Sequence, residues 1–164
     1  MFFTDWRQLP ASTDYMQTGA WVWRGIVPWC KPDARPQLGR FTAQCEYVIW
    51  GTAGTMPADP SGKAIAGFYE CTAPRDRVHV TQKPLALMRE LLRVVRPGAI
   101  VLDPFMGSAT TGVAALQTGR GFVGIELDPA HFENACERIN EAHRQGALFD
   151  HSDTAQQQAR LSFE

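Results

Sequence analysis

A glycine-containing turn at residues 103–112 carries the side chains best suited to ligand chemistry. It reads Asp103-Pro104-Phe105-Met106-Gly107-Ser108-Ala109-Thr110-Thr111-Gly112. An apolar run precedes the turn and a short helix is predicted after it, which is where open α/β sheets bind nucleotide-like ligands. Gly107 allows the backbone to pass close to a ligand. The amides near Ser108 to Thr111 would lie at a helix N-terminus, a position that favours an anion.

The residues around the turn discriminate between ligands. Gly107 and Gly112 have the glycine spacing of a P-loop, but Val113 and Ala114 follow where lysine and a hydroxyl residue are required. The dinucleotide pattern GxGxxG is also missing from this turn. Asp103 would repel a pyrophosphate placed beside it. A ligand that combines a cationic amino group and a sulfonium with a carboxylate fits better, because Asp103 can face the cation while the helix N-terminus accepts the carboxylate.

An acidic residue completes the candidate site. Glu126 ends the next predicted strand and follows Gly107 by 19 positions (126 − 107). In such units an acid about 20 residues beyond the glycine turn binds a ribose hydroxyl. Together Asp103 and Glu126 predict an adenosine-bearing cation, of which S-adenosylmethionine (SAM) is the obvious example. The alternatives are a helix-capping role for Asp103 and a solvated strand-end role for Glu126.

The elements that must position these residues form a βαβα unit. Helical spacing of Met88, Leu91, Leu92 and Val95 predicts a helix that starts at Pro84 and ends at Pro97-Gly98. The unit itself is predicted as a strand over 99–102 that is buried on both faces, a helix over 111–117, a strand over 121–127, and a second helix that Asp128-Pro129 caps and opens. Such alternation predicts a parallel sheet.

The N-terminal part favours strands. Residues 1–6, 21–29 and 47–50 are aromatic and β-branched, and all five tryptophans lie in the first 50 residues, where core packing explains them. Residues 53–77 are rich in glycine and proline and predict a long loop. We therefore expect one domain over 1–143, with a loop or small recognition insertion at 53–80, and a polar, disordered tail over 144–164.

Composition limits the function classes. The 164 residues carry a net charge of −1, so charge alone does not indicate nucleic acid. The four cysteines include no CxxC pair, which argues against a metal site or a disulfide framework and fits a reducing cytoplasm. No apolar run approaches the ~20 residues of a membrane span, and no export signal is visible. These features predict a soluble, cytoplasmic protein.

Several motifs resemble one enzyme family. Residues 103–112 are similar to the DPFxGSGTTG motif of DNA amino-methyltransferases that act on adenine N6 or cytosine N4, with Ala109 replacing a glycine. Thr81-Gln82-Lys83-Pro84 resembles the TxKP motif of the β-type order, and Gly124-Ile125-Glu126 resembles the ribose-binding strand. The segments FTDWRQLP and GRFTAQCEYVIWG resemble phage and prophage members, which implies a bacterial or phage-infected cell. The resemblance covers about residues 1–140.

This resemblance implies a Rossmann-like, SAM-dependent methyltransferase fold with a mixed, mostly parallel sheet. The reaction it implies is direct transfer of the SAM methyl group to an exocyclic amino group of DNA. The residues implied to bind SAM are Lys83, Asp103, Pro104, Phe105, Gly107, Ser108, Thr110, Thr111 and Glu126. Three basic residues in or beside the long loop, Lys63, Arg75 and Arg77, either contact DNA phosphate or are ordinary exposed charges.

The catalytic motif of the family, [DNS]PP[YFW], has no match in the sequence. None of the 11 prolines follows another, and Pro28-Trp29 lies in a strand of the wrong region. By resemblance, the motif ends a strand between 99–102 and 2–6, so we expect one or more central strands to be missing through truncation or a misplaced start. A separate polypeptide that supplies the strand is a further possibility. A SAM-binding remnant without catalysis, a methyltransferase for another substrate, and a nicotinamide oxidoreductase remain as alternatives.

Overall fold

The computed structural model describes residues 1–56, 64–74 and 82–161, with side chains described as far as residue 145. The chain divides into two compact units, Met1–Ala73 and Pro74–Glu164. The division falls inside the segment 53–80 that the sequence assigns to a loop or insertion. Within the described residues, no helix has the length and apolar character needed to cross a membrane.

The first unit contains a four-stranded sheet in the order β1-β3-β2-β4. Its strands are β1 (Phe2–Thr4), β2 (Val22–Cys30), β3 (Cys45–Thr52) and β4 (Tyr69–Glu70). β3 pairs with β1 and β2 in antiparallel fashion, whereas β4 joins the other edge of β2 in parallel. The three predicted strands are therefore confirmed. The short β4 lies inside the predicted loop and was not expected.

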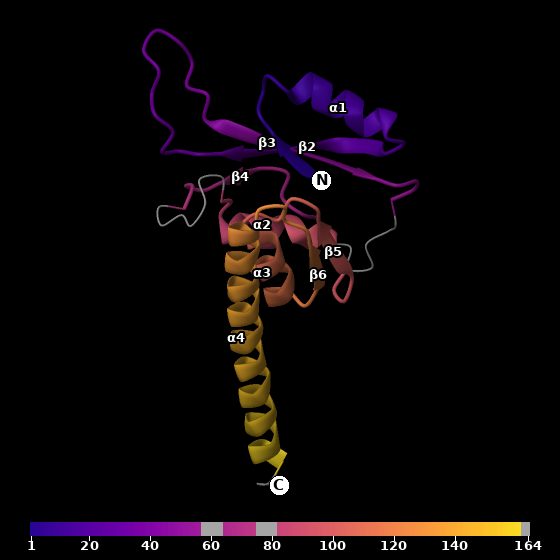
Figure 1. Cartoon of the computed structure of the whole chain (residues 1–164), viewed down its shortest axis with the longest axis vertical. Helices are drawn as coiled ribbons and strands as arrows, with labels where there is room; N and C mark the ends of the chain where they lie inside the picture. Colours follow the sequence, from indigo (N-terminus) through magenta and orange to yellow (C-terminus); the bar gives the residue numbers. More distant parts are fainter. Residues whose placement is uncertain (57–63, 75–81, 162–164) are drawn as a thin grey trace. The chain divides into compact units, whose positions relative to one another are not determined.

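Helix α1 (Leu9–Thr18) packs on β2 and β3 of this sheet (Figure 1). The sequence did not predict this helix, because its buried residues, Ser12, Thr13 and Met16, do not form an apolar stripe. The Ser12 hydroxyl lies 3.0 Å from the Thr4 hydroxyl and links the helix to β1. Proline in the first turn is the one sequence signal that marks where the helix begins.

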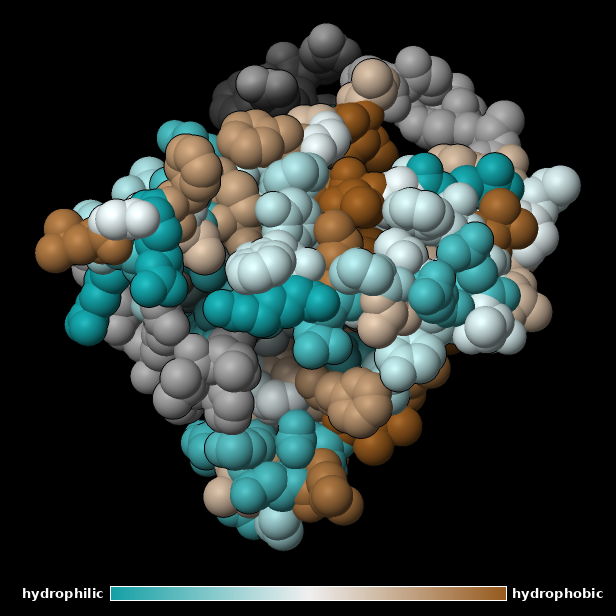
Figure 2. Space-filling model, turned by 90° about the horizontal axis from the view of Figure 1, so that it is seen from above, coloured by the Kyte–Doolittle hydropathy of each residue, from teal (hydrophilic) through white to brown (hydrophobic). Residues whose placement is uncertain are grey.

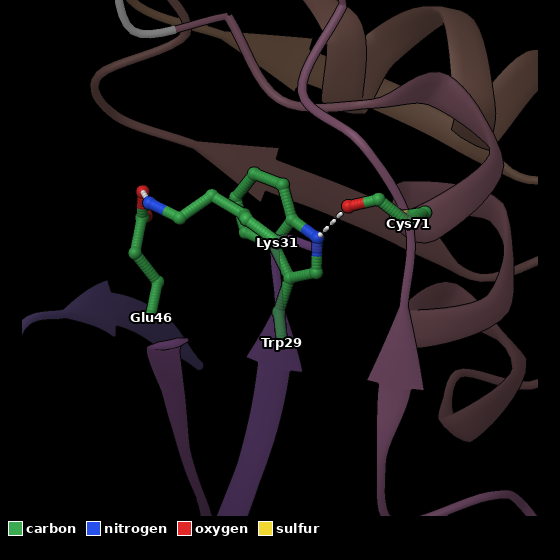
Figure 3. A network of polar contacts seen from close by, with 4 residues as sticks. All are labelled: Trp29, Lys31, Glu46 and Cys71. Carbon is green, nitrogen blue, oxygen red and sulfur yellow. Dashed lines mark hydrogen bonds and ion pairs between the residues drawn. The ribbon is translucent and has the colours of Figure 1, made fainter. Parts of the chain in front are cut away.

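The tryptophans do not share the core position that was expected of them. Trp29 is only 2% exposed, but Trp6, Trp21 and Trp23 are 41–53% exposed. Figure 2 shows that hydrophobic residues reach the surface among hydrophilic ones on the face that it presents. The Trp29 ring packs edge-on against Phe3, and its Nε1 donates to the Cys71 carbonyl at 2.9 Å (Figure 3). Core packing therefore explains Trp29 and does not explain these three exposed tryptophans.

The second unit contains the predicted βαβα arrangement. Its elements are α2 (Leu85–Leu91), the 3-10 helix η1 (Leu92–Val94), β5 (Ile100–Asp103), α3 (Thr110–Gln117), β6 (Gly121–Gly124) and α4 (Pro129–Leu161). β5 and β6 pair in parallel, with Leu102 opposite Val123. Helix α3 packs against α2 and α4 as well as against β6 (Figure 1). This layout confirms the helices and strands expected over residues 84–143.

The β5–β6 sheet is covered on one face, which corrects the expectation that residues 99–102 are buried on both faces. Ile100 and Leu102 are 72% and 61% exposed, and Val123 and Ile125 are also exposed. We call these four residues the apolar face. Alternate residues of the strands, such as Phe122, lie on the other side, against α3. An apolar sequence is therefore not proof of two-sided burial.

The fold class is confirmed as α/β with mixed sheets, but the strands are divided between two sheets. Among the described residues, two strand pairs are antiparallel and two are parallel, so the sheets are mixed, as expected. β5 pairs only with β6 in the described part of the chain, so each of these strands keeps one free edge there.

Helix α4 continues to Leu161, where the composition predicted a disordered tail from residue 144. After Pro129 the helical stretch contains no further proline, and alanine and glutamine, which favour helices, are frequent in it. Glu141 also accepts hydrogen bonds from Arg144 and Gln145 one turn later. A polar composition without an apolar stripe is thus compatible with a helical backbone.

Candidate cofactor site

The glycine turn is fixed to the end of β6 by backbone hydrogen bonds. The Asp103 carbonyl accepts from the Ile125 amide at 2.9 Å, and the Met106 amide donates to the Ile125 carbonyl at 3.0 Å. The Asp103 carboxylate accepts from the Phe105 amide at 3.1 Å. Asp103 therefore shapes the turn that follows β5, while the exposed Phe105 ring, 88% accessible, stays on its outside.

Glu126 joins the two halves of the site. Its Oε2 accepts from the Gly107 amide at 2.9 Å, and its Oε1 accepts from the amides of Leu127 and Asp128 at 2.9 and 3.0 Å. Hydrogen bonding from the Asp128 amide, with smaller contributions from the Gly107 and Leu127 amides, lowers the pKa of Glu126. A carboxylate offers about four acceptor positions, so these three bonds leave room for one more donor.

This arrangement bears on the alternative role of Glu126 as a solvated strand-end carboxylate. The side chain is half-buried and binds three amides, one of them in the glycine turn 19 residues earlier in the chain. The structure thus brings Gly107 and Glu126 into direct contact, as their spacing in the sequence suggested. Ionised oxygens beside the glycine turn present an acceptor to a ligand hydroxyl at that point.

Two residues of the turn have left-handed backbone conformations. Gly107 has φ = +51°, and Ala109, the N-cap of α3, has φ = +54°. Alanine in this conformation costs roughly 1–2 kcal/mol because Cβ approaches the following carbonyl. The Ala109 methyl is fully buried with Met106 and Ala135, which offsets part of that cost. The turn therefore keeps its conformation although alanine stands where the related motif has glycine.

The start of α3 provides polar groups that point to a ligand. Ser108 and Thr110 are 7% and 6% exposed, and Thr111 is half-buried. Among the described residues the Thr110 Oγ1 is buried without a hydrogen-bond partner. A buried hydroxyl without a partner is uncommon in native proteins and indicates an absent partner such as a ligand or water. The first amides of a helix also lack partners within the helix.

Arg138 is a site residue that the sequence did not predict. From α4 its Nη1 donates to the Ser108 carbonyl, and burial lowers the pKa of this guanidinium. Arg138 lies at the i+3 position after the buried Ala135 and four residues before the buried Ala142. A cation on the apolar face of an amphipathic helix was the available signal, because such a charge needs a partner in the fold.

The other predicted residues lie around the turn or outside the described chain. Pro104 is exposed beside Phe105, and Lys83 lies half-buried immediately before α2, the helix that packs on α3. The basic residues Lys63, Arg75 and Arg77, together with Thr81 of the TxKP segment, lie outside the described residues.

A glycine turn after one parallel strand, a helix start beside it and an acid at the end of the next strand define a nucleotide-binding α/β protein of the Rossmann-like class. The comparison with known families makes the class specific. Residues 49–137 match the N6/N4-methyltransferase family model, described as DNA methylase. The chain belongs to this DNA methylase family.

Curated relatives agree with this family. The putative methylase YubD of Escherichia coli (strain K12) is 35% identical over 111 residues, which cover 65% of this chain and 47% of the relative. The Type II methyltransferase M.XycI of Xanthomonas campestris pv. cyanopsidis is 32% identical over 139 residues, which cover 76% of this chain and 46% of the relative. The chain thus spans about half the length of these relatives.

Solved structures confirm the fold. The M1.HpyAVI–SAM complex matches with a TM-score of 0.70 and 28% identity, over 84% of this chain and 72% of the other. The cytosine-N4-specific PvuII DNA methyltransferase matches with a TM-score of 0.68 at 15% identity, over 85% of this chain and 62% of the other. The second likeness concerns the fold alone.

Proposed function

We propose that this chain is the SAM-binding part of a site-specific DNA methyltransferase that modifies an exocyclic amino group of adenine or cytosine. The observation that carries the proposal is the 2.9 Å hydrogen bond between the Gly107 amide and the Glu126 carboxylate. This bond joins the turn at Gly107, whose glycine allows a ligand to approach the backbone closely, to the ionised Glu126 carboxylate. Both lie beside the N-terminus of α3 at one edge of the β5–β6 sheet. An enzyme of this kind would act on DNA in the cytoplasm.

The residues of the glycine turn fit an adenosine-bearing cation. In the proposed complex Glu126 accepts a ribose hydroxyl, Asp103 faces the cationic end, and the start of α3 with Ser108, Thr110 and Thr111 receives the carboxylate. SAM supplies an activated methyl group on its sulfonium. The chain holds the ligand and orients that methyl group, and such alignment provides much of the rate in a direct transfer.

Three further residues near the turn complete the proposed SAM-binding site. Phe105 offers an exposed ring for an apolar contact with the ligand, and Pro104 restricts the backbone beside it. Lys83 precedes α2 and supplies a positive charge at the start of that helix segment. A ligand hydroxyl or carboxylate that reaches Thr110 would also satisfy its buried oxygen.

Binding and catalysis separate in this proposal. Isothermal titration of the purified chain with SAM tests the proposed binding site. A separate titration with NADH tests the alternative that the chain is a nicotinamide oxidoreductase. We expect heat of binding with SAM and none with NADH. Binding of NADH without SAM would overturn the proposed ligand.

The second candidate is a SAM-binding protein that does not transfer methyl groups by itself. It is favoured by the absence of a Pro-Pro pair, since the related enzymes contact the flipped base through such a motif. We propose that transfer requires a polypeptide segment that carries the motif and covers the apolar face. Parallel sheets are covered on both faces in nearly all folds, and this face is exposed.

Transfer of labelled methyl groups from SAM to unmethylated DNA distinguishes the two candidates. We expect no transfer by the chain alone, and transfer after addition of the part of M.XycI that this chain does not match. Transfer by the chain alone would contradict the need for a second segment. SAM binding without transfer in either assay would leave the non-catalytic candidate as the better description.

A further inference from the structure

Two cysteines face each other where the β2–β3 hairpin opens. Cys30 is the last residue of β2 and Cys45 the first of β3, and they are register partners. In the next pair outward, the Lys31 amide donates to the Gln44 carbonyl at 2.8 Å. Hydrogen-bonded and non-hydrogen-bonded pairs alternate along an antiparallel ladder, so the cysteines occupy a non-hydrogen-bonded pair with Cα atoms ~4.5 Å apart.

This position suits a covalent link between the two sulfurs. Directly opposed residues lie on the same face of a sheet. A disulfide requires Cα atoms about 4.4–6.8 Å apart, which includes the spacing of a non-hydrogen-bonded pair. Both residues are free thiols, with Cys30 buried and Cys45 half-buried. The strand register therefore does not have to change for the sulfurs to meet.

The thiols already interact with each other. The Gln44 side-chain amide donates to the Cys30 sulfur at 3.3 Å, and the proximity of the Cys30 thiol contributes to the raised pKa of Cys45. Burial, followed by the contact with Cys30, raises the pKa of Cys45 above its usual value. At neutral pH most Cys45 is therefore the neutral thiol, so oxidation proceeds through its minor thiolate form and should be faster in alkaline solution.

Neighbouring contacts hold the two strand ends in place. The Lys31 ammonium pairs with the Glu46 carboxylate at 2.9 Å and lies over the Trp29 ring (Figure 3). Lys31 follows Cys30 and Glu46 follows Cys45, so this ion pair joins the same two strands beside the thiols. On the other side of β2, the Cys71 amide donates to the Cys30 carbonyl at 3.1 Å, which engages Cys71 through its main chain.

We propose that Cys30 and Cys45 form an oxidisable dithiol, a modification site at which hydrogen peroxide converts the pair to a cross-strand disulfide. The thiolate of the more accessible Cys45 attacks one peroxide oxygen, becomes a sulfenic acid and releases hydroxide. The Cys30 sulfur then displaces the sulfenic hydroxyl, which leaves as water when it takes up a proton. In total two thiols are oxidised, one peroxide is reduced, and two water molecules form. The bond closes residues 31–44 into a ring.

The test uses the whole chain, treated with hydrogen peroxide, blocked with iodoacetamide and digested with trypsin. Cleavage after Arg24, Arg40, Lys63 and Arg75 separates the candidate cysteines, because Lys31 and Arg35 precede proline and resist cleavage. We expect loss of two of the four thiols, loss of the mass of two hydrogen atoms, and a linked pair of peptides 25–40 and 41–63. Dithiothreitol should restore both peptides.

Matched variants keep the test decisive. Cys45→Ser should abolish the linked peptides, whereas Cys136→Ser, in α4 of the other unit, should leave them unchanged. A link between peptides 25–40 and 64–75 would assign the bond to Cys71 and overturn the proposal. Equal thiol loss in the wild-type chain and in Cys45→Ser would overturn it as well. Because the peptide mapping uses the wild-type chain, the assignment of the bond to Cys30 and Cys45 does not depend on the folding of a variant.

Discussion

At the scale of single residues, Glu126 has two functions that the sequence alone does not separate. It closes the glycine turn through the Gly107 amide, and it is the proposed acceptor for a ribose hydroxyl. Its lowered pKa keeps the carboxylate ionised at neutral pH, so both functions use the charged form. A change at this position should therefore affect the turn and the ligand together.

Glu126→Gln should weaken SAM binding by about tenfold or more, because the amide replaces a charged acceptor with a neutral one and turns an NH₂ group toward the bound amides. Isothermal titration at neutral pH measures this change. Glu137→Gln, an exposed acid in α4, is the matched control and should bind SAM like the wild type. Unchanged affinity in Glu126→Gln would contradict the proposed ribose contact.

The pH dependence of the Glu126 contribution has a defined sign. The pKa of Glu126 in the folded chain lies below its ordinary value of 4.5, so the unfolded chain takes up a proton first as the pH falls. The stability that Glu126 adds is complete above pH 4.5 and disappears as the pH falls through the folded pKa. Urea unfolding of the wild type and Glu126→Gln should therefore give a constant difference between pH 6 and 8 that shrinks in acid. A difference that grows in acid would contradict the assignment.

At the scale of elements, close packing of α3 on β6 and anchoring of the strand ends hold the site together. Gly112 in α3 faces the Phe122 ring, which would lie only 2.6 Å from an added Cβ. Arg120, 8% exposed, donates through Nε to the Val95 carbonyl at 2.9 Å and through Nη1 to the Thr118 carbonyl at 2.6 Å. These contacts fix the ends of α3 and β6 relative to the helix before β5.

Gly112→Ala should destabilise the chain by about 1–3 kcal/mol, because the new methyl group overpacks the contact with the Phe122 ring. The free energy of unfolding in urea measures the effect. Gln117→Ala, an exposed change in the same helix, should alter stability by less than about 0.5 kcal/mol. Equal stability of the two variants would show that α3 moves away from β6 at little cost.

Arg120→Met should lower the free energy of unfolding by about 3 kcal/mol, because it leaves carbonyls of Val95 and Thr118 without their donor. Arg93→Met is a suitable control, since Arg93 forms an exposed ion pair with Glu90, and should cost about 0.5 kcal/mol. Both values come from the same urea titration. A small loss in Arg120→Met would mean that water replaces the guanidinium.

At the scale of the whole molecule, the proposed DNA substrate must be bound by a chain with a net charge of −1. Attraction to phosphate then depends on local clusters of basic residues, because the overall charge provides none. Lys63, Arg75 and Arg77 are the proposed cluster, and they lie outside the described residues. Their contribution is therefore a question for binding measurements.

If Arg75 and Arg77 contact phosphate, the double variant Arg75→Ala, Arg77→Ala should reduce the slope of log affinity against log salt by about 1.8, since each phosphate contact contributes about 0.9. Fluorescence anisotropy with labelled duplex DNA over a series of salt concentrations gives the slope. Arg93→Ala, which removes one exposed charge of α2–η1, is the control for general charge loss. An unchanged slope in the double variant would mean that the two arginines are ordinary surface charges.

The sequence by itself determined the order of helices and strands over residues 84–143, the glycine turn at Gly107 and its acid at Glu126. These features depend on residues close together in the chain: helical spacing, proline and glycine at element ends, and the length of one βαβ unit. For the same reason the family motifs were recognisable before the fold was known.

Tertiary structure alone decided which surfaces are covered and which side chains meet. Ile100 and Leu102 belong to an apolar run of the sequence, yet their side chains are exposed. Helix α1 buries Ser12 and Thr13, although its sequence has no apolar stripe. Cys30 and Cys45 lie 15 positions apart without a cysteine motif, yet the β2–β3 register places them opposite each other. Burial and cross-strand contact depend on which segments pack together, and that choice is made by the whole chain.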